Sequence, residues 1–228
     1  TNKILKINNA LTNHNAQNAA KENRLPVPIY AEGESLTALK VMASAGINPA
    51  NGKELFLKKD GSLTYLYHYN DRIVVGDTSP KAQGSVGLNA NYGSFSLSST
   101  FVYRLGATQY NHTLATKVEG ADPTNNVDER AFFARWKQEG DIVKFRNVAW
   151  NGTVVPSSRF VAKEYTLEGT SVMLSYIFSQ KLCKQLKVSD MKVSFSLGQF
   201  FYLSSIKRER GLDYPFAHVY ELDFQLKL

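Results

Sequence analysis

The last thirteen residues, Phe216-Ala-His-Val-Tyr-Glu-Leu-Asp-Phe-Gln-Leu-Lys-Leu228, decide the fold class, because apolar and polar side chains alternate along them. Even positions carry aromatic or aliphatic side chains except at His218, and odd positions carry mostly polar or charged ones. A period of two predicts a β-strand with one apolar face. If the odd face met lipid, Glu221 and Asp223 would each cost up to roughly 2–4 kcal/mol, so we expect the even face to be the apolar one.

The overall composition permits an ordered protein and restricts how it could enter a membrane. The chain has 228 residues, 43% hydrophobic and 12% aromatic, with a net charge of +7 and a mean hydropathy of -0.29. Its apolar runs are far shorter than the roughly 20 residues of a spanning helix, but several alternating stretches are near the roughly 9–11 residues of a tilted transmembrane strand. A membrane location is therefore predicted only as a β-barrel.

A β-hairpin is the clearest local signal. Gly84–Tyr92 and Phe95–Leu105 both alternate, and the two residues Gly93-Ser94 connect them. One face is apolar, with Val86, Leu88, Ala90, Tyr92, Phe95, Leu97, Phe101, Tyr103 and Leu105. The other is mainly small and neutral, with Gly87, Asn89, Asn91, Ser96, Ser98, Thr100, Val102 and Arg104, which is typical of a crowded or water-filled lumen. A soluble antiparallel sandwich also alternates and stays an alternative.

Two further strands are predicted before the terminal one. Tyr165–Phe178 has an apolar parity, although Glu168 would then have to lie beyond the apolar band. Met191–Leu203 alternates until Gln199-Phe-Phe-Tyr202 breaks the rhythm, which predicts a β-bulge there. Together with the hairpin and the terminal strand, these segments predict an all-β, antiparallel sheet.

The lengths of the connections predict an orientation. Outer membrane barrels join their strands by short turns on the periplasmic side and by long loops outside. Here the short connections are Gly93-Ser94 and Ser179–Asp190, and the long extracellular segments are Asn8–Lys81, Gly106–Lys163 and the loop Ser204–Pro215. The last strand would then run inward, which predicts a periplasmic C-terminus.

The long segments contain smaller features. A hairpin is predicted around Asp60-Gly61, and Val127–Lys137 reads as a short helix with Asp128 as its cap. Asn8–Asn23 has no clear period and is expected to be a loop. Thr1–Ile7 reads as the middle of a strand without a preceding signal peptide, so we expect the chain to be part of something longer.

Catalytic and metal-binding patterns are weak in this sequence. The four histidines are far apart, and none pairs with another at metal-ligand spacing. The sequence contains no nucleophile elbow, phosphate-binding loop or Cys-x-x-Cys pair. Lysine and arginine are spread along the chain, unlike the clustered footprint of a nucleic-acid-binding protein. We therefore expect no enzyme activity, no metal, no cofactor and no nucleic acid.

Aromatic and polar side chains supply the binding candidates. An exposed ring in an outer segment can stack on a sugar or anchor a protein partner, and the candidates there are Tyr65, Tyr67, Trp136 and Trp150. The lumen-facing candidates are the polar side chains Asn89, Asn91 and Arg104. Aromatic residues near the strand ends suit interfacial girdles.

Six stretches, in order and spread over nearly the whole chain, resemble the C-terminal part of SusC/RagA-like TonB-dependent outer membrane transporters. They are Gly46–Glu54, Val75–Lys81, Arg135–Asp141, Ser157–Val161, Met191–Phe201 and Glu209–Ala217. The resemblance is identified on their combination, since each stretch alone is unspecific. It implies that residues 1–228 are the C-terminal segment of such a barrel, with the plug domain and the earlier strands absent.

The resemblance also implies a function and partners. It implies the last strands of a large, plugged barrel of about 22 strands in the outer membrane of a Gram-negative bacterium, importing oligosaccharides or, as the lesser alternative, peptides. The implied partners are a SusD-like surface lipoprotein, TonB, outer membrane lipid and the remaining N-terminal part of the transporter. The strand end read during barrel assembly would comprise Tyr220, Leu222, Phe224, Leu226 and Leu228.

Two alternatives to this interpretation remain open. The first is a soluble β-sandwich that serves as a glycan-binding or adhesin module. The second is a small self-contained barrel that uses Leu63–Tyr69 and Arg72–Val75 as extra strands.

Overall fold

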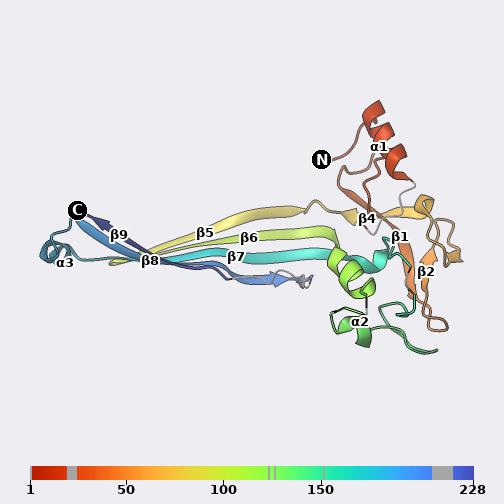
Figure 1. Cartoon of the computed structure of the whole chain (residues 1–228). Coiled ribbons are helices and arrows are strands. Elements are labelled where there is room, and N and C mark those ends of the chain that lie inside the picture. Colours follow the sequence, from red (N-terminus) through yellow and green to blue (C-terminus); the bar gives the residue numbers. More distant parts are fainter. Residues whose placement is uncertain (1, 20–24, 123, 126, 151, 207–217) are drawn as a thin grey trace. The chain divides into compact units, whose positions relative to one another are not determined.

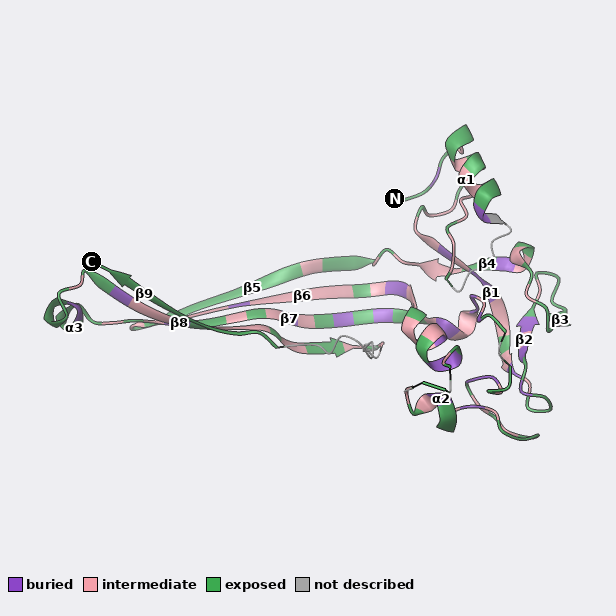
Figure 2. Ribbon diagram, in the orientation of Figure 1, coloured by how far each residue is buried: buried purple, intermediate pink, exposed green. Residues whose placement is uncertain are grey.

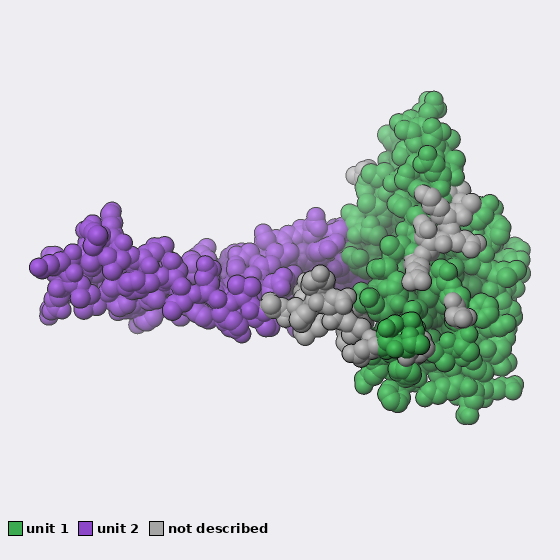
Figure 3. Space-filling model, in the orientation of Figure 1, with its two compact units in different colours: residues 1–79, 107–163, 209–211 green, residues 80–106, 164–208, 212–228 purple. Residues whose placement is uncertain are grey.

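The computed structural model describes residues 2–19, 25–122, 124–125, 127–150, 152–206 and 218–228. The chain forms two compact units, which Figure 3 distinguishes by colour. The first unit contains residues 1–79, 107–163 and 209–211, and the second contains residues 80–106, 164–208 and 212–228. A four-stranded sheet lies in the first unit, and most of a five-stranded sheet lies in the second.

The longer sheet has five strands in the order β5-β6-β7-β8-β9 (Figure 1). These are β5 (Ala82–Tyr92), β6 (Phe95–Tyr110), β7 (Val161–Ile177), β8 (Asp190–Ser204) and β9 (Tyr220–Lys227). Each strand therefore lies beside its neighbour in the sequence. Strand β5 pairs with β6, β7 with β8 and β8 with β9, each in antiparallel register. The prediction of an all-β antiparallel fold is confirmed.

The register of the β5–β6 hairpin is the predicted one. The pairs Val86 with Phe101 and Tyr92 with Phe95 lie on one face, and Asn89 pairs with Ser98 on the other. Gly93 begins the two-residue turn at a φ of 58°, in the left-handed region that glycine tolerates best. Because directly opposite residues share a face of the sheet, the predicted division into an apolar and a polar face holds for this hairpin.

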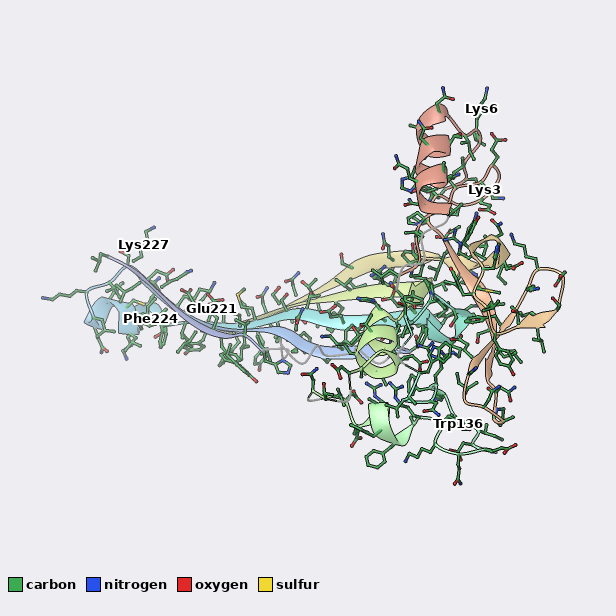
Figure 4. The ribbon with its side chains drawn as sticks, turned by 45° about the vertical axis from the view of Figure 1, so that its right-hand side comes forward. Lys3, Lys6, Trp136, Glu221, Phe224 and Lys227 are labelled. Carbon is green, nitrogen blue, oxygen red and sulfur yellow. The ribbon has the colours of Figure 1, made fainter. Side chains whose placement is uncertain are left out.

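The same division continues across β7, β8 and β9. Phe195 pairs with Leu174 on one side and with Leu222 on the other, so one apolar row crosses three strands. On the opposite face Ser194 lies between Ser175 and Asp223. Figure 2 shows β9 exposed along its whole length, and Figure 4 labels Glu221, Phe224 and Lys227 on it. The parity predicted for the terminal strand is therefore the observed one.

A β-bulge lies at the predicted position in β8. The pairing with β7 shifts between Gly169, which lies opposite Phe201, and Ser171, which lies opposite Gly198. Gln199 within this bulge has a backbone φ of 47°, which residues other than glycine seldom adopt. The extra residue is therefore accommodated by a local kink.

The parity of the buried residues in β7 differs between the two sides of this bulge. On one side of the bulge Leu174 is 46% exposed and Ser175 is buried, whereas on the other side Leu167 is 40% exposed and Thr166 is buried. The buried residue thus has an even number at Thr166 and an odd number at Ser175, although the odd residues Met173 and Ile177 on the Ser175 side are also exposed, at 40% and 43%. Glu168 has the same parity as the buried Thr166, and its place beyond the apolar band stays a prediction.

The short connections and the end of β9 meet at one end of this sheet. Ile177 donates its backbone N–H to the carbonyl of Ser94 at 2.9 Å, and Ser189 donates to the carbonyl of Lys227 at 2.7 Å. The connection from β7 to β8 contains the short helix α3 (Gln180–Gln185). The predicted grouping of the short connections at the C-terminal end of the sheet follows from these contacts.

The first unit contains a four-stranded antiparallel sheet in the order β3-β2-β1-β4. Its strands are β1 (Ala38–Ile47), β2 (Glu54–Leu57), β3 (Leu63–Thr64) and β4 (Arg72–Asp77). The hairpin around Asp60-Gly61 is confirmed, with Gly61 at a φ of 85°. Strands β3 and β4 pair within this sheet, so they do not extend the five-stranded sheet as a small self-contained barrel would require.

Short helices complete the first unit. They are α1 (Asn9–Ala19), η1 (Tyr69–Asp71), the π-helical turn η2 (Leu114–Glu119), α2 (Arg130–Phe133) and η3 (Ser158–Phe160). The buried apolar cluster of this unit consists of Ala115, Val118, Phe145, Val154 and Phe160. The predicted helix within Val127–Lys137 is confirmed as the shorter α2, but its N-cap is Glu129, which makes no capping side-chain hydrogen bond. The predicted cap, Asp128, lies one residue earlier, and its Oδ1 accepts the backbone N–H of Arg130 at 2.9 Å.

Two expectations for the N-terminal region are wrong. Within residues 2–7, Lys3 forms only an isolated bridge with Ser35 in place of a strand. The expected loop at Asn8–Asn23 contains α1, whose first turn is capped where Asn8 Oδ1 accepts the backbone N–H of Leu11 at 3.0 Å. Because α1 lacks an apolar stripe and depends on polar side-chain contacts, hydrophobic periodicity could not reveal it.

Some predicted features lie outside the described residues. These are the start of the terminal strand at Phe216, most of the loop Ser204–Pro215 and the stretch Glu209–Ala217. Among the helices that the structure describes, none is long and apolar enough to cross a membrane.

Substitution of Gly169 tests the packing at the bulge. A Cβ on Gly169 would lie 2.5 Å from the ring of Phe200 and 2.8 Å from that of Phe201, and both rings already contact Phe101 at centroid distances of 5.9 and 6.0 Å. We expect Gly169→Val to lower the free energy of unfolding by about 1–3 kcal/mol, because the rings must leave this cluster. Denaturant unfolding measures the change.

Gly87→Val is the matched control for this substitution, since a Cβ at Gly87 meets nothing within 4 Å. Equal stability losses for the two variants would contradict the proposed packing.

Candidate functional site

A pocket of about 470 Å³ opens in the first unit. It is lined by Lys53, Glu54, Phe56, Tyr65, Leu66, Tyr67, Arg146, Trp150, Gly152, Thr153 and Val155. Its volume lies within the roughly 300–1,000 Å³ range of small-ligand sites. The structure therefore brings together three of the predicted ligand-binding residues, Tyr65, Tyr67 and Trp150.

The aromatic side chains of the pocket are both exposed and positioned. Tyr65 and Trp150 are 45% and 48% exposed. The hydroxyl of Tyr65 accepts hydrogen bonds from the side-chain amides of Asn48 and Asn51, and the Lys53 ammonium lies 5.4 Å from the Trp150 ring centroid. These contacts hold the rings while leaving part of their surface free for stacking against a ligand.

The positions of the rings follow from local structure. Phe56 on β2 packs edge to face against Tyr67 at a centroid distance of 6.1 Å. Gly152 approaches Trp150 so closely that a Cβ there would lie 2.9 Å from the indole nitrogen. The β2–β3 hairpin thus supplies one wall of the pocket, and the segment around Trp150 supplies another.

Buried charges form a network next to the aromatic wall. Arg159 Nη2 lies 2.7 Å from Glu54 Oε2 and 3.0 Å from Glu119 Oε1, and Arg146 Nε lies 2.6 Å from Glu119 Oε1. These four residues come from β2, η2, η3 and the loop between α2 and η3. Since each charge has an opposite partner, the network ties four distant segments together, and two of its members, Glu54 and Arg146, line the pocket.

Two arginines of this region also bind the backbone. Arg135 Nη2 donates to the carbonyl of Val118 at 2.6 Å, and Arg159 Nη1 donates to the carbonyl of Lys144 at 2.6 Å. Guanidinium groups suit this role because they carry several donors in a fixed plane. Arg135 and Arg159 therefore also fix the course of the loops.

The network controls the charge of Glu54. Burial alone raises the pKa of this carboxyl, but the hydrogen bond and the charge of Arg159 outweigh it, so the pKa of Glu54 lies below its ordinary value. The charged form of Arg159 is also favoured. Burial alone lowers the pKa of this guanidinium, but the hydrogen bonds and charges of Glu54 and Glu119 outweigh it, so the pKa of Arg159 lies above its ordinary value. Both groups are therefore charged at neutral pH.

A second pocket of about 340 Å³ lies beside the first. Its lining includes Thr116, Glu119, Asp122 and Arg135, and it shares Trp150 and Gly152 with the first pocket. The indole of Trp150 thus borders both pockets. The two cavities form neighbouring polar and aromatic compartments in the same unit.

Trp136, the fourth predicted aromatic residue, has a structural position (labelled in Figure 4). Its indole nitrogen donates to the carbonyl of Pro49 at 2.7 Å. Its ring covers Gly52 so closely that a Cβ there would lie 2.5 Å from it. Trp136 is absent from the linings of both pockets, and it anchors one loop to another.

The polar candidates of the second unit do not converge. Asn89 and Asn91 pair with Ser98 and Ser96 near the hairpin turn, whereas Arg104 pairs with Gln83 at the other end of β5. Six residues of strand separate Asn89 from Gln83, a distance of about 20 Å. These three side chains therefore line one face without forming one site.

Arg104 has a partner of its own within the sheet. Its Nη2 lies 3.7 Å from Glu164 Oε2, and the Glu164 side chain is largely buried. The pairing places a charged pair on the polar face of the sheet.

The five residues of the predicted assembly signal lie on β9 or just after it. Tyr220, Leu222, Phe224, Leu226 and Leu228 are all exposed, from 48% at Leu226 to 91% at Leu228. Their recognition by an assembly machinery stays a prediction.

Comparison with known proteins shows similarity of fold to solved structures. A scan against protein-family models found no match, and a search of curated proteins found none either. The structure of the RagAB peptide transporter matches with a TM-score of 0.61 at 17% identity over 78% of this chain and 20% of that chain. The RagAB peptide importer in the "closed-closed" state matches with a TM-score of 0.62 at 16% identity over 81% of this chain and 21% of that chain.

A third match, the RagAB peptide importer in the "open-open" state, has a TM-score of 0.58 at 15% identity over 75% of this chain and 19% of that chain. The chain spans about a fifth of the length of these solved structures. At such identities the similarity shows a shared fold: this chain has the fold of a segment of those structures.

Several pocket residues carry no signal in the sequence. Glu54 and Arg146 lie in short or irregular segments, and they become neighbours of the aromatic rings only through the fold. Arg159 lies in the Ser157–Val161 stretch that resembles the transporter family, but the sequence alone assigns it no partner. A buried ion pair between such distant segments could not be predicted without the pairing of β1 with β2.

Substitution of Arg159 tests the buried network. Arg159→Met would leave Glu54 and Glu119 without this partner, so we expect the free energy of unfolding to fall by about 3–5 kcal/mol at neutral pH. The loss should shrink in acid, because burial without Arg159 raises the pKa of Glu54 and protonation then removes its charge. Denaturant unfolding at two pH values measures both effects.

Arg130→Met is the control for this prediction. Arg130 pairs with Asp128 at 2.6 Å, but both side chains are partly exposed, at 27% and 32%. Surface pairs contribute only about 0–1 kcal/mol. An Arg159→Met loss as small as the Arg130→Met loss would contradict the assigned role of the network.

Proposed function

We propose that this chain is part of an outer membrane, TonB-dependent importer of nutrients, in which the five-stranded sheet spans the membrane. The observation that carries the proposal is the exposed apolar face of that sheet. It includes Val86, Leu88, Tyr92, Phe95, Leu174, Phe195, Leu222, Phe224 and Leu226, each between 44% and 88% exposed. Continuous apolar surfaces of this kind are rare on soluble monomers and suit lipid.

The opposite face supports the same proposal. Ser175 and Ser194 share a buried hydrogen bond of 2.9 Å between their hydroxyls, and Ser196 donates to Glu221 at 3.2 Å. A face of small polar side chains with internally satisfied hydrogen bonds suits a crowded or hydrated lumen. A soluble sandwich would require the opposite arrangement, with its apolar face covered by a second sheet.

The fold similarity supports the class of protein that we propose, a transporter. The matching structures are described as a peptide transporter and a peptide importer, and the similarity supports the role of a transporter segment. We propose a complete barrel formed with further N-terminal residues that supply the plug and the TonB contact, and a SusD-like lipoprotein as surface partner. The short connections, and with them the C-terminal end, would face the periplasm.

The substrate class follows from the aromatic pocket. Tyr65, Tyr67 and Trp150 offer partly exposed rings, and Lys53 and Thr153 offer polar groups beside them. Rings with adjacent hydrogen-bonding groups suit the alternating apolar and hydroxyl surfaces of a sugar. We propose oligosaccharides as the substrate, with peptides as the alternative that the matched transporters suggest.

Single-cysteine labelling tests the membrane assignment of β9. In a background with Cys183 replaced by serine, Leu222→Cys and Phe224→Cys should react with a lipid-soluble thiol reagent in membranes. Glu221→Cys and Asp223→Cys should not, because their side chains lie on the polar face opposite Ser196 and Ser194. Mass spectrometry of the labelled protein measures the pattern.

The controls for this experiment are internal, since the four positions lie on adjacent residues of one strand. The reverse labelling pattern, or a folded chain that stays monodisperse without detergent, would refute the membrane assignment.

Replacement of Trp150 tests the ligand-binding role of the pocket. We expect Trp150→Ala to weaken oligosaccharide binding about three- to tenfold, because a well-placed aromatic contact contributes about 0.5–1.5 kcal/mol. Phe133→Ala is the matched control, since the Phe133 ring is 76% exposed and lies outside both pockets. Isothermal titration with oligosaccharides and with peptides gives both affinities.

If Trp150→Ala weakens peptide binding but leaves oligosaccharide binding unchanged, peptides would replace oligosaccharides as the proposed substrate. Equal affinities of both variants for every ligand would show that this pocket is not the binding site.

A further inference from the structure

We propose that the α3 turn binds the anionic headgroups of phospholipids at the membrane surface on the side of the short connections. The proposal rests on the membrane location proposed above. It concerns a surface of the second unit that is separate from the aromatic pocket. The surface consists of Lys181, Lys184 and Lys187 together with Leu182 and Leu186, which we name the lysine-leucine turn.

The aromatic residues around the end of the sheet indicate the depth of this turn in the membrane. Phe95 and Tyr176 pack at a centroid distance of 4.8 Å, and Tyr176 and Phe178 pack at 5.0 Å. Tyr92, which pairs with Phe95, is 88% exposed. Aromatic rings on the outer face at the end of a spanning sheet mark the boundary between hydrocarbon and headgroups. Since α3 begins two residues after Phe178, it lies at headgroup level.

The sheet also holds the turn in place. Ser179 caps α3 by accepting the backbone N–H of Leu182, and Cys183 is fully buried. Phe178 donates its backbone N–H to the carbonyl of Met191 at 3.0 Å, and Ser189 donates to that of Lys227 at 2.7 Å. The turn is therefore a fixed element whose remaining side chains face outward.

The exposed side chains of the turn combine positive charge with apolar groups. The three lysines are exposed, and no ion pair joins them to a carboxylate within the described part of the chain. Residues 179–189 contain no aspartate or glutamate. Leu182 and Leu186 are 36% and 55% exposed, and their spacing of four places them on one side of α3. Ammonium groups flanking an apolar stripe suit an anionic lipid surface.

The backbone at Lys187 is consistent with a functional requirement for lysine. Its φ is 58°, and Val188 donates its N–H back to the carbonyl of Cys183 at 3.0 Å, which closes the helix end. This position usually carries glycine or asparagine. A lysine there breaks a local preference, and such departures concentrate at functional sites.

Lipid binding by the full chain in neutral detergent tests the proposal. Native mass spectrometry would compare phosphatidylglycerol with phosphatidylcholine at equal concentrations. Each lysine near an anionic surface strengthens binding about fivefold, so Lys181→Gln, Lys184→Gln and Lys187→Gln together should reduce phosphatidylglycerol binding by about tenfold or more. The corresponding triple arginine variant should retain it.

Three exposed lysines of the first unit provide the matched control. Lys59→Gln, Lys117→Gln and Lys144→Gln together change the net charge equally, and phosphatidylglycerol binding should stay at the wild-type level. Equal losses in both triple variants would show a general charge effect and overturn the proposal.

Further arms distinguish a lipid from other anions. Leu182→Ser with Leu186→Ser should weaken phosphatidylglycerol binding, and glycerol phosphate should compete poorly with the lipid. Competition by glycerol phosphate at equal concentration, or by an acidic protein in its place, would overturn the assignment to lipid. If the lipid-soluble reagent labels β9 as expected but phosphatidylglycerol is not preferred over phosphatidylcholine, the lipid-binding role of the lysine-leucine turn is refuted. The proposed membrane function then still stands.

Discussion

The alternation of apolar and polar side chains across β5 to β9 is the constraint on which the long sheet depends. Because the side-chain period of a strand is two, a slip of one residue would exchange the two faces completely. The row Leu174, Phe195 and Leu222 shows that three strands keep one register over this part of the sheet. The bulge at Gln199 adds one residue to β8 and shifts its pairing with β7 between Gly169 and Ser171.

The sequence predicts the long sheet well because its signals are local and repeated. The β5–β6 hairpin, the extent of β8 and the parity of β9 all follow from period-two patterns bounded by short connections. Prediction from the sequence fails where apolar and polar side chains do not alternate with a regular period. Strand β1 is rich in small residues, and its adjacent residues Val41 and Met42 are both fully buried, so it shows no alternation. Helix α1 could not be predicted from hydrophobic periodicity either, because polar contacts stabilise it in place of an apolar face.

The candidate site was only partly visible in the sequence. Aromatic content pointed to Tyr65, Tyr67 and Trp150, but it pointed equally to Trp136, which the fold uses to anchor a loop. Trp136 and Trp150 each pack against a glycine, but the indole nitrogen of Trp136 donates to the carbonyl of Pro49, and its ring lies outside both pockets. The contacts of Trp136 join positions far apart in the chain. The buried charges are harder still, because nothing near Glu54 or Arg159 in the sequence indicates their pairing.

The two polar regions of the chain differ in what they leave free for a ligand. On the long sheet Arg104 is paired with Glu164, and Ser175 with Ser194, so the polar face satisfies much of its own chemistry. In the pocket the buried charges are also paired, but Tyr65 and Trp150 keep about half of their surface exposed. Loops on a rigid base can change such side chains without disturbing a register. Differences in ligand preference among chains of this fold should therefore arise in the pocket and spare the sheet, where the register tolerates little change.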